Sequence, residues 1–292
     1  AWLKFYYPEC FYTSLLNSLP MGFYSASQLV QDAQRHGVTI LPVCVNHSQK
    51  DHTVIIQHNS PAIQLGLRMV KGLSQQAIES VIANRPPQGY EYLSQVKQLS
   101  ISRRDIELLA SANAMQILSG NRYKTRWNMM DSVNDLPLFR QLQETPSHYD
   151  HQPSEMENAI EDFSSTGVTL NKHPISLLDE AGNLGRFIRL NQLHTIAHKS
   201  LVTVVGIVTG KQSPGTAAGV TFFTLEDDTG NINVVVWGAT ARAQKQAYLT
   251  AKVLKVKGIL EREGEVVHVI AGRLIDLTDQ LENLKTHSRD FH

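Results

Sequence analysis

The sequence predicts a multidomain α+β protein, in which a mixed N-terminal segment and an all-α block precede an all-β barrel. Apolar residues recur every three or four positions over residues 61–134, and strict alternation replaces this spacing from Leu201 onward. A stretch rich in acidic residues, Pro and Ser separates the two patterns. The chain has 292 residues, 42% of them hydrophobic, which suffices for about two cores and excludes wholesale disorder.

Charge and cysteine content exclude several classes of protein. The 27 Lys and Arg residues balance 27 Asp and Glu residues, so the chain is not a polycation that coats duplex DNA by charge alone. Cys10 and Cys44 form no C-x-x-C pattern, which argues against a disulfide framework or cysteine zinc site and favours a reducing, cytoplasmic compartment. We find no signal peptide and no run of about 18 apolar residues, so we expect no membrane-spanning segment.

Residues 1–60 are predicted to form a small segment of helices and strands. Helical spacing extends over residues 2–19, and a second helix is expected after Ser25, which has Gln28 at capping-box spacing. Strands are expected at 38–45 and 53–57. The chain opens without an initiator Met, so we expect it to be a fragment of a longer protein.

Residues 61–134 are predicted to be helical and basic. Through residue 130 this block has nine basic and four acidic residues. The expected helices are 75–84, 92–98, 103–115 and 122–130.

Two turns in this block precede helix N-termini. The first runs through Lys71 and Gly72 to Ser74, and the second leads into Arg103 and Arg104. Backbone amides exposed at such turns suit a phosphate, so the tandem arrangement indicates two helix-hairpin-helix motifs that grip a DNA backbone without reading sequence. The alternative is an ordinary helical bundle with a solvated basic face. The candidate DNA contacts are Arg68, Lys71, Gly72, Ser74, Arg103 and Arg104.

An acidic linker is predicted over residues 135–165. From residue 131 this region has eight acidic residues against a lone Arg140, and Pro and Ser interrupt its periodicity. Within it, Asp135, Leu136, Leu138 and Phe139 form a candidate sliding-clamp motif, although such motifs usually open with Gln; the alternative is local packing. A helical connector is expected over 166–200, and a C-terminal tail over 278–292.

Residues 201–277 are predicted to form an OB fold. Strands are expected at 201–208, 220–225, 232–237, 253–260 and 266–271, with a helix at 239–248. Three strands, a helix and two strands is the element order of an OB barrel. Gly206 and Gly258 stand where a small barrel must bend sharply.

The barrel offers candidate contacts to single-stranded nucleic acid. We assign stacking to Trp237 and Phe223, with Phe222 as the other choice, and strand-path charges to Lys211 in the first loop and to Lys255 and Lys257. The alternative is that the aromatic rings fill the barrel. A rival function is a protein-docking module with little DNA affinity, which the near-neutral charge of residues 200–276 favours.

No catalytic or metal site is predicted. Asp227 and Asp228 are best explained as a hairpin turn, because side chains of neighbouring strand residues point apart. The chain has no phosphate-binding Gly-rich loop and no G-x-S-x-G. His194 and His198 have helical ligand spacing but no third ligand, so we expect them to be structural.

Several strings carry a family resemblance. The sequence resembles the C-terminal third of bacterial C-family DNA polymerases of the alpha-subunit type, and LLNSLPMGFYSASQLVQDAQRHGV at 15–38 is similar to the error-prone, damage-inducible ImuC branch. Ser74 stands where this family often has Gly. The other matching strings are AWLKFYYPECF at 1–11, GLRMVKGLSQQAIESVI at 66–82, TGVTLNKHP at 166–174 and PGTAAGVTFFTLEDDTGNINVVVW at 214–237.

The resemblance implies an intact DNA-directed DNA polymerase that performs translesion synthesis during SOS-type DNA repair, with Mg²⁺ and deoxynucleotides. Residues 1–60 then correspond to the end of the fingers domain. The catalytic palm lies outside this chain, so the fragment has no catalytic residue and no cofactor of its own. Implied partners are primer-template and single-stranded DNA, a catalytically inactive Y-family-like protein, a RecA-like protein and the sliding clamp.

Overall fold

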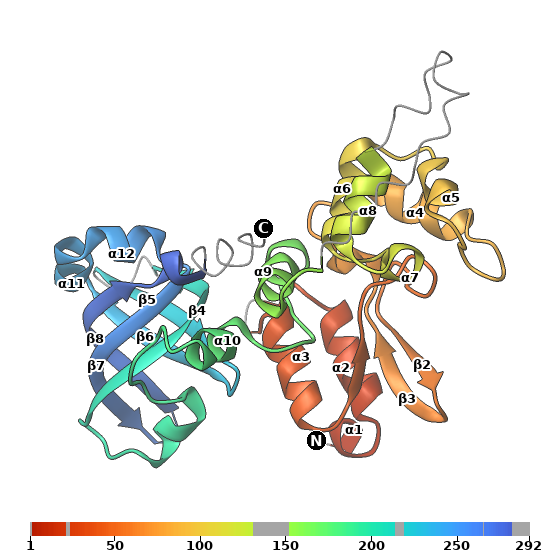
Figure 1. Ribbon diagram of the computed structural model, residues 1–292. Helices are drawn as coiled ribbons and strands as arrows, with labels where there is room; N and C mark the ends of the chain where they lie inside the picture. The colour runs from red at the N-terminus through yellow and green to blue at the C-terminus, as the bar shows by residue number, and fades with distance from the viewer. Residues whose placement is uncertain (1, 22–23, 131–151, 214–218, 265, 282–292) are drawn as a thin grey trace. The chain divides into compact units, whose positions relative to one another are not determined.

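The computed structural model describes residues 2–21, 24–130, 152–213, 219–264 and 266–281. They belong to two compact units, which divide between Leu170 and Asn171. The first unit combines helices with a three-stranded sheet, and the second contains a closed barrel (Figure 1). The predicted α+β class is confirmed. In the described part of the chain, no helix has the length and apolarity needed to cross a membrane.

The first unit begins with three helices and a small sheet. The helices are α1 (Trp2–Tyr6), α2 (Pro8–Asn17) and α3 (Ala26–Arg35), and the strands are β1 (Thr39–Leu41), β2 (Thr53–Gln57) and β3 (Ser60–Gln64). The predicted capping box of Ser25 and Gln28 is present at α3. The sheet has the order β1-β3-β2, with β1 parallel and β2 antiparallel to β3.

Strand β3 was not predicted, since the helical block was expected to begin at residue 61, and Pro61 is unusual in a central strand. Pro61 pairs only with Ile56 of β2, whereas β1 pairs with β3 from Ala62 onward. The missing amide of Pro61 therefore lies beyond the ladder that β3 shares with β1.

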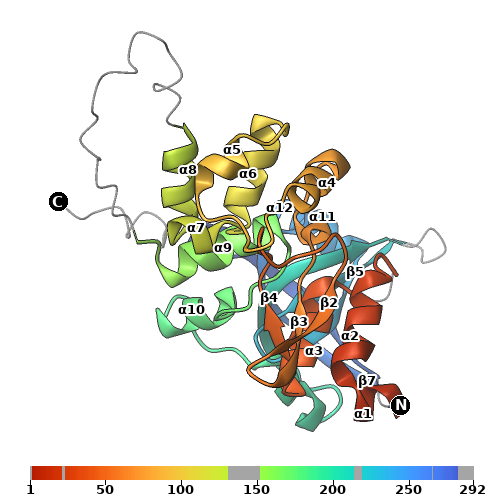
Figure 2. The same cartoon turned by 90° about the vertical axis from the view of Figure 1, so that its right-hand side faces the viewer.

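The helical block follows the sheet and shares its core. Its elements are η1 (Leu67–Met69), α4 (Gln75–Ala83), α5 (Leu93–Lys97), α6 (Arg103–Ser111), α7 (Gln116–Ser119) and α8 (Arg122–Met130), which Figure 2 shows grouped together. The predicted helix over 103–115 ends early, at Ser111, and Asn113 has a left-handed φ of 55°. Leu16, Ile63 and Leu109 belong to one hydrophobic core, so the predicted segments 1–60 and 61–134 lie in one compact unit.

The predicted linker is wrong for its last eleven residues, which form α9 (Glu155–Ser165). Ser154 accepts a hydrogen bond from the Glu157 amide (3.1 Å), and the Glu157 carboxylate accepts one from the Ser154 amide (2.8 Å). The Pro-Ser pair that suggested a break is thus a helix start with a capping box. The candidate clamp motif at Asp135–Phe139 lies outside the described residues.

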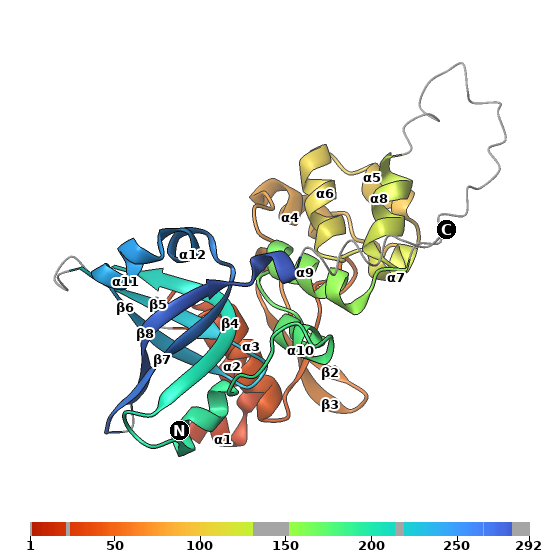
Figure 3. The same cartoon turned by 60° about the vertical axis from the view of Figure 1, so that its left-hand side comes forward.

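The second unit confirms the predicted OB fold. After α10 (Pro174–Glu180) and η3 (Leu190–Thr195), the barrel closes in the order β4-β5-β6-β8-β7, with β6 and β8 parallel (Figure 3). The predicted helix between the third and fourth strands is two short ones, α11 (Gly238–Ala243) and α12 (Lys245–Thr250). The strands are β4 (Leu201–Gln212), β5 (Val220–Glu226), β6 (Asn231–Trp237), β7 (Val253–Glu263) and β8 (Val266–Asp276).

Candidate nucleic-acid interface

A single carboxylate joins the two predicted hairpins. Ser74 and Ser102 are the N-caps of α4 and α6. The Asp105 carboxylate accepts hydrogen bonds from the Ser74 amide (3.0 Å), the Ser74 hydroxyl (3.1 Å) and the Ser102 hydroxyl (2.6 Å). Burial acts to raise the pKa of Asp105, but the hydrogen bonds from Ser102 and Ser74 outweigh it and lower this pKa. The carboxylate stays charged and fixes both helix N-termini.

Ser74 therefore has a different role from the predicted DNA contact. Its amide and its hydroxyl both donate to Asp105, and its hydroxyl also accepts from the Ala77 amide (3.1 Å). A phosphate at this amide would have to displace a buried carboxylate. The capping-box spacing of Ser102 and Asp105 was visible in the sequence, but the bonds to Ser74, 31 positions away, were not.

Gly72 and Arg104 lie side by side at the hairpin surface. Gly72 has a φ of 78°, and a Cβ built on it would lie 3.7 Å from Nη2 of Arg104. Within the described residues, neither the Gly72 amide nor the Arg104 guanidinium has a recorded hydrogen-bond partner. Arg103 is also exposed, and its side chain makes one ion pair with Glu107 (3.5 Å). An unbonded amide beside the unpaired Arg104 guanidinium is suited to a phosphate.

Arg68 and Lys71 make structural contacts at the positions predicted for DNA binding. The Arg68 guanidinium donates to Asp51 (2.9 Å) and to the carbonyls of Asn17 (3.0 Å) and Leu19 (3.1 Å). The Lys71 ammonium donates to the Phe163 carbonyl (2.7 Å), and burial lowers its pKa. These donors already hold α2 and α9 in place.

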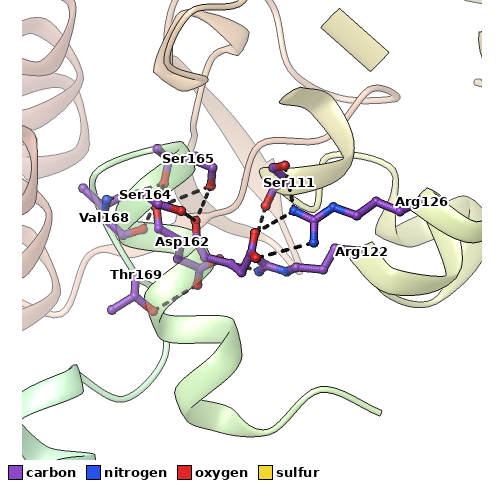
Figure 4. Close-up of polar contacts among 10 residues, drawn as sticks. Ser111, Arg122, Arg126, Asp162, Ser164, Ser165, Val168 and Thr169 are labelled. Carbon is purple, nitrogen blue, oxygen red and sulfur yellow. Dashed lines mark hydrogen bonds and ion pairs between the residues drawn. The ribbon is translucent and has the colours of Figure 1, made fainter. Parts of the chain in front are cut away.

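An ionic cluster fastens α9 to the helical block (Figure 4). Arg122 is 2% exposed and donates to the Ser111 carbonyl (2.9 Å) and to Asp162 (2.5 Å). Arg126 pairs with Glu161 (2.7 Å) and donates to the Ser111 hydroxyl (2.8 Å). Burial raises the pKa of Asp162, although Arg122 acts to lower it. Two of the acidic residues that suggested a solvated linker, Glu161 and Asp162, are thus partners of the basic block.

The predicted stacking role of Phe223 is wrong. Phe223 is 1% exposed and belongs to the barrel core, because it shares strand parity with buried Leu225. Its neighbour Phe222 is half-buried on the other side of β5. The parity was visible in the sequence, because Leu225 is two positions beyond Phe223.

Trp237 forms the exposed part of an apolar outer face on β5 and β6. Its side chain is 51% exposed and pairs across the strands with Val220, while Phe222 pairs with Val235. Thr224 donates to the Asn233 side chain (3.2 Å) further along the same face. One indole with a free face beside a phenyl ring is suited to base stacking.

The barrel lysines differ in whether their ammonium groups already bond to the protein. Lys211 lies in β4 rather than in the predicted loop, donates to the Tyr248 carbonyl (2.9 Å) and sits 3.7 Å from the centre of the Tyr248 ring. Lys255 donates to the Leu184 carbonyl (2.5 Å). Lys257 is exposed. Lys255 and Lys257 alternate with buried Leu254 and Val256, as predicted for an outward-facing pair.

The acidic turn and His198 have structural roles. The buried Asp227 carboxylate accepts from the amides of Thr229 (2.7 Å), Gly230 (3.0 Å) and Leu190 (2.9 Å), which agrees with the predicted turn. His198 accepts from the Arg262 amide (3.0 Å). The described residues hold no group of three His, Cys, Asp or Glu side chains arranged for a metal ion.

Two family models match the chain and define its class. A helix-hairpin-helix motif matches residues 37–125, and an OB-fold nucleic acid binding domain matches residues 202–277. Together with the geometry above, they define a chain that combines a helix-hairpin-helix module with an OB-fold module.

Comparison with curated proteins gives the particular relationship. The error-prone DNA polymerases of Vibrio campbellii and Vibrio parahaemolyticus are each 66% identical to the chain over 293 residues, covering 100% of it and 29% of each relative. That of Idiomarina loihiensis is 42% identical over 296 residues and is covered to 28%. Homologues named error-prone DNA polymerase thus cover the whole chain, which confirms the resemblance, and the chain spans less than a third of their length.

Solved structures add little. Asparaginyl-tRNA synthetase from Pyrococcus horikoshii aligns over 32% of this chain and 23% of its own, with 16% identity and a TM-score of 0.29, which is too low to bear on function.

Proposed function

We propose that this chain is the DNA-binding region of an error-prone DNA polymerase that extends primers past lesions during damage-induced repair in the cytoplasm. Similarity along the whole chain to proteins of that name supports the proposal. Because the chain spans 29% of those relatives, we assign the polymerase chemistry, with its Mg²⁺ and deoxynucleotides, to the rest of the intact protein. The described residues then bind DNA and take no part in forming the new phosphodiester bond.

The helical module is proposed to hold duplex DNA by its backbone. The observation that carries this proposal is the placement of Gly72 beside Arg104 by the Asp105 carboxylate, which brings the two hairpins together. A backbone amide and a guanidinium from different hairpins offer two donors to one phosphate. No base-reading element is required, which suits a polymerase that must accept any sequence.

Replacing Arg104 by Gln is expected to weaken duplex binding and to lower the slope of log affinity against log salt by about 1, because one phosphate contact is lost. The measurement is a salt-titrated duplex-binding assay on the 292-residue chain. Arg35→Gln on α3 is the matched control, since Arg35 is exposed but lies outside the hairpins. An unchanged affinity and slope for Arg104→Gln would remove the hairpins from the proposed duplex path.

Replacing Trp237 by Ala is expected to weaken single-strand binding by about 1–3 kcal/mol, the usual contribution of one stacked base. Fluorescence anisotropy with a short oligothymidine measures the change. Leu249→Ala on α12 removes a side chain of similar exposure, 58% against 51%, and should leave the affinity unchanged. Equal affinities of Trp237→Ala and the unaltered chain would show that bases do not stack on this face.

A second candidate is that the barrel docks protein partners. Lys211 and Lys255 already donate to carbonyls of the protein, and residues 200–276 are near neutral in charge, which favours this candidate. The partners that the resemblance implies are the inactive Y-family-like protein, the RecA-like protein and, through them or directly, the sliding clamp. A barrel that bound these proteins but no single strand at low salt would support docking over DNA binding.

A further inference from the structure

A cluster of cations lies on the outer face of β7 and β8. Lys257 of β7 and Arg273 of β8 are direct cross-strand partners, and both are exposed. Side chains paired in this way have Cβ atoms about 4.5–5.5 Å apart. Lys255 lies two residues from Lys257 on the same face, about 6.7 Å along the strand.

The connector before the barrel adds a fourth cation. Its Leu184 carbonyl accepts from the Lys255 ammonium (2.5 Å), and its Ile188 amide donates to the carbonyl of Thr203, the β4 partner of Lys257. Exposed Arg186 lies between these two anchor points. The connector backbone at Arg186 is therefore held beside the two lysines, and the four cations come from three separate segments.

These cations are not neutralised within the described chain. No ion pair is recorded there for Arg186, Lys255, Lys257 or Arg273. Nearby acidic groups are otherwise engaged: Asp179 and Asp228 pair with Arg189, Glu261 pairs with His268, and Asp276 accepts from Thr250 and Thr278. Burial and then the charge of Lys257 lower the pKa of Lys255. Like charges opposite one another in a sheet are destabilising, so an anionic ligand bound here would stabilise the barrel.

The two lysines of the cationic cluster lie on a strand that does not border the aromatic face. In the closed order β4-β5-β6-β8-β7, strand β7 borders only β4 and β8, whereas Trp237 and Phe222 lie on β6 and β5; Arg273 lies on β8, the strand between β7 and β6 (Figure 3). One short oligonucleotide stacked on Trp237 thus does not need this cluster. A longer strand that continues around the barrel reaches it.

We propose that Arg186, Lys255, Lys257 and Arg273 form a second nucleic-acid surface, which binds the phosphodiester backbone of a strand that extends beyond the aromatic face. Three features favour this ligand over an acidic peptide: the row on β7, whose step is comparable to the spacing of successive phosphates; two guanidinium groups, which bind phosphate in bidentate fashion; and the nucleic-acid class of the matching OB-fold family. The inference rests on the proposed function only in taking DNA as the ligand.

The test compares oligothymidines of two lengths on the double variant Lys257→Glu/Arg273→Glu. Affinity for a long oligothymidine should fall about 10–100-fold near 0.1 M salt, and its salt slope should fall by about 2, while a short one binds unchanged. The double variant Lys257→Gln/Arg273→Gln serves as a safeguard in case charge reversal disturbs folding. It should show a smaller loss of affinity for the long oligothymidine. The control Arg35→Glu/Lys50→Glu makes the same charge change at two exposed residues of the first unit and should bind both lengths normally.

The outcomes separate the two proposals. Unchanged affinity of both double variants for the long oligothymidine would overturn the second surface. It would also be overturned if the double variants lost binding to a polyglutamate peptide while their DNA binding stayed intact. If the unaltered chain bound neither oligothymidine, both the proposed DNA-binding function of the barrel and the second surface would be overturned. Equal losses of affinity for the short and the long oligothymidine would show that the cationic cluster and the aromatic face form one binding surface, which would contradict the proposal of a second surface.

Discussion

Replacing Arg122 by Ala is expected to lower the free energy of unfolding of the first unit by about 3 kcal/mol, because it leaves the carboxylate of Asp162, which is only 16% exposed, without its charged partner. Asp162 would keep only the Thr169 hydroxyl (3.1 Å) from outside its helix, and the Ser111 carbonyl would lose a charged donor. Urea denaturation followed by circular dichroism measures the change. Arg103→Ala removes an arginine that is 77% exposed and should change stability by less than about 0.5 kcal/mol.

The same substitution should also weaken duplex binding. Helix α9 supplies the Phe163 and Ser165 carbonyls that accept from Lys71 in the first hairpin, so loosening α9 loosens that hairpin. Arg122→Ala is therefore expected to lose affinity for duplex DNA although it touches no DNA. A stability change below about 1 kcal/mol would contradict the assignment of the cluster as the fastening of α9.

Replacing Gly258 by Ala is expected to destabilise the barrel by about 3 kcal/mol, the upper part of the usual range for overpacking. A Cβ at Gly258 would lie 2.2 Å from the Ile270 carbonyl oxygen, so the β7–β8 ladder would have to move apart. The measurement is thermal or urea unfolding of the full chain with Trp2 and Trp127 replaced by Phe, so that fluorescence reports Trp237 of the barrel.

A second glycine on the facing strand provides the control for this prediction. Gly272→Ala places its Cβ 3.4 Å from the Lys257 carbonyl oxygen, an ordinary contact, and should leave stability nearly unchanged. If the two alanine variants unfolded at the same denaturant concentration, close approach at Gly258 would not be the feature that requires glycine there.

Strand parity and helix starts were predictable, because they depend on neighbours in sequence. The alternation of Leu254 and Val256 with lysines indicated a strand whose inner face is apolar, and Val202, Val204 and Val208 shared one side of the first strand. The cap of α3 followed from Ser25 and Gln28 alone. The start of α9 was misinterpreted as a break because its Pro-Ser signal occurs in both helix N-termini and linkers.

The site was less predictable, because its partners are distant in sequence. The hairpins were found from their glycine and serine spacing, but Arg68 and Lys71 proved to bind Asp51 and Phe163, which no local pattern connects to them. Phe223 was placed outside the barrel although its parity with Leu225 pointed inward. The charge of a side chain is fixed by its type, whereas its availability to a ligand depends on what else lies within reach.

The sequence by itself determined the order of the modules, the OB topology and the kinship to error-prone DNA polymerases, because periodicity, turn residues and family motifs are local properties of the chain. Only the tertiary structure decided which cations remain unneutralised. Asp105 brings Gly72 to Arg104, and strand pairing brings Lys257 to Arg273. These approaches depend on hydrogen bonds and sheet register between segments far apart in the chain, which a linear pattern does not encode.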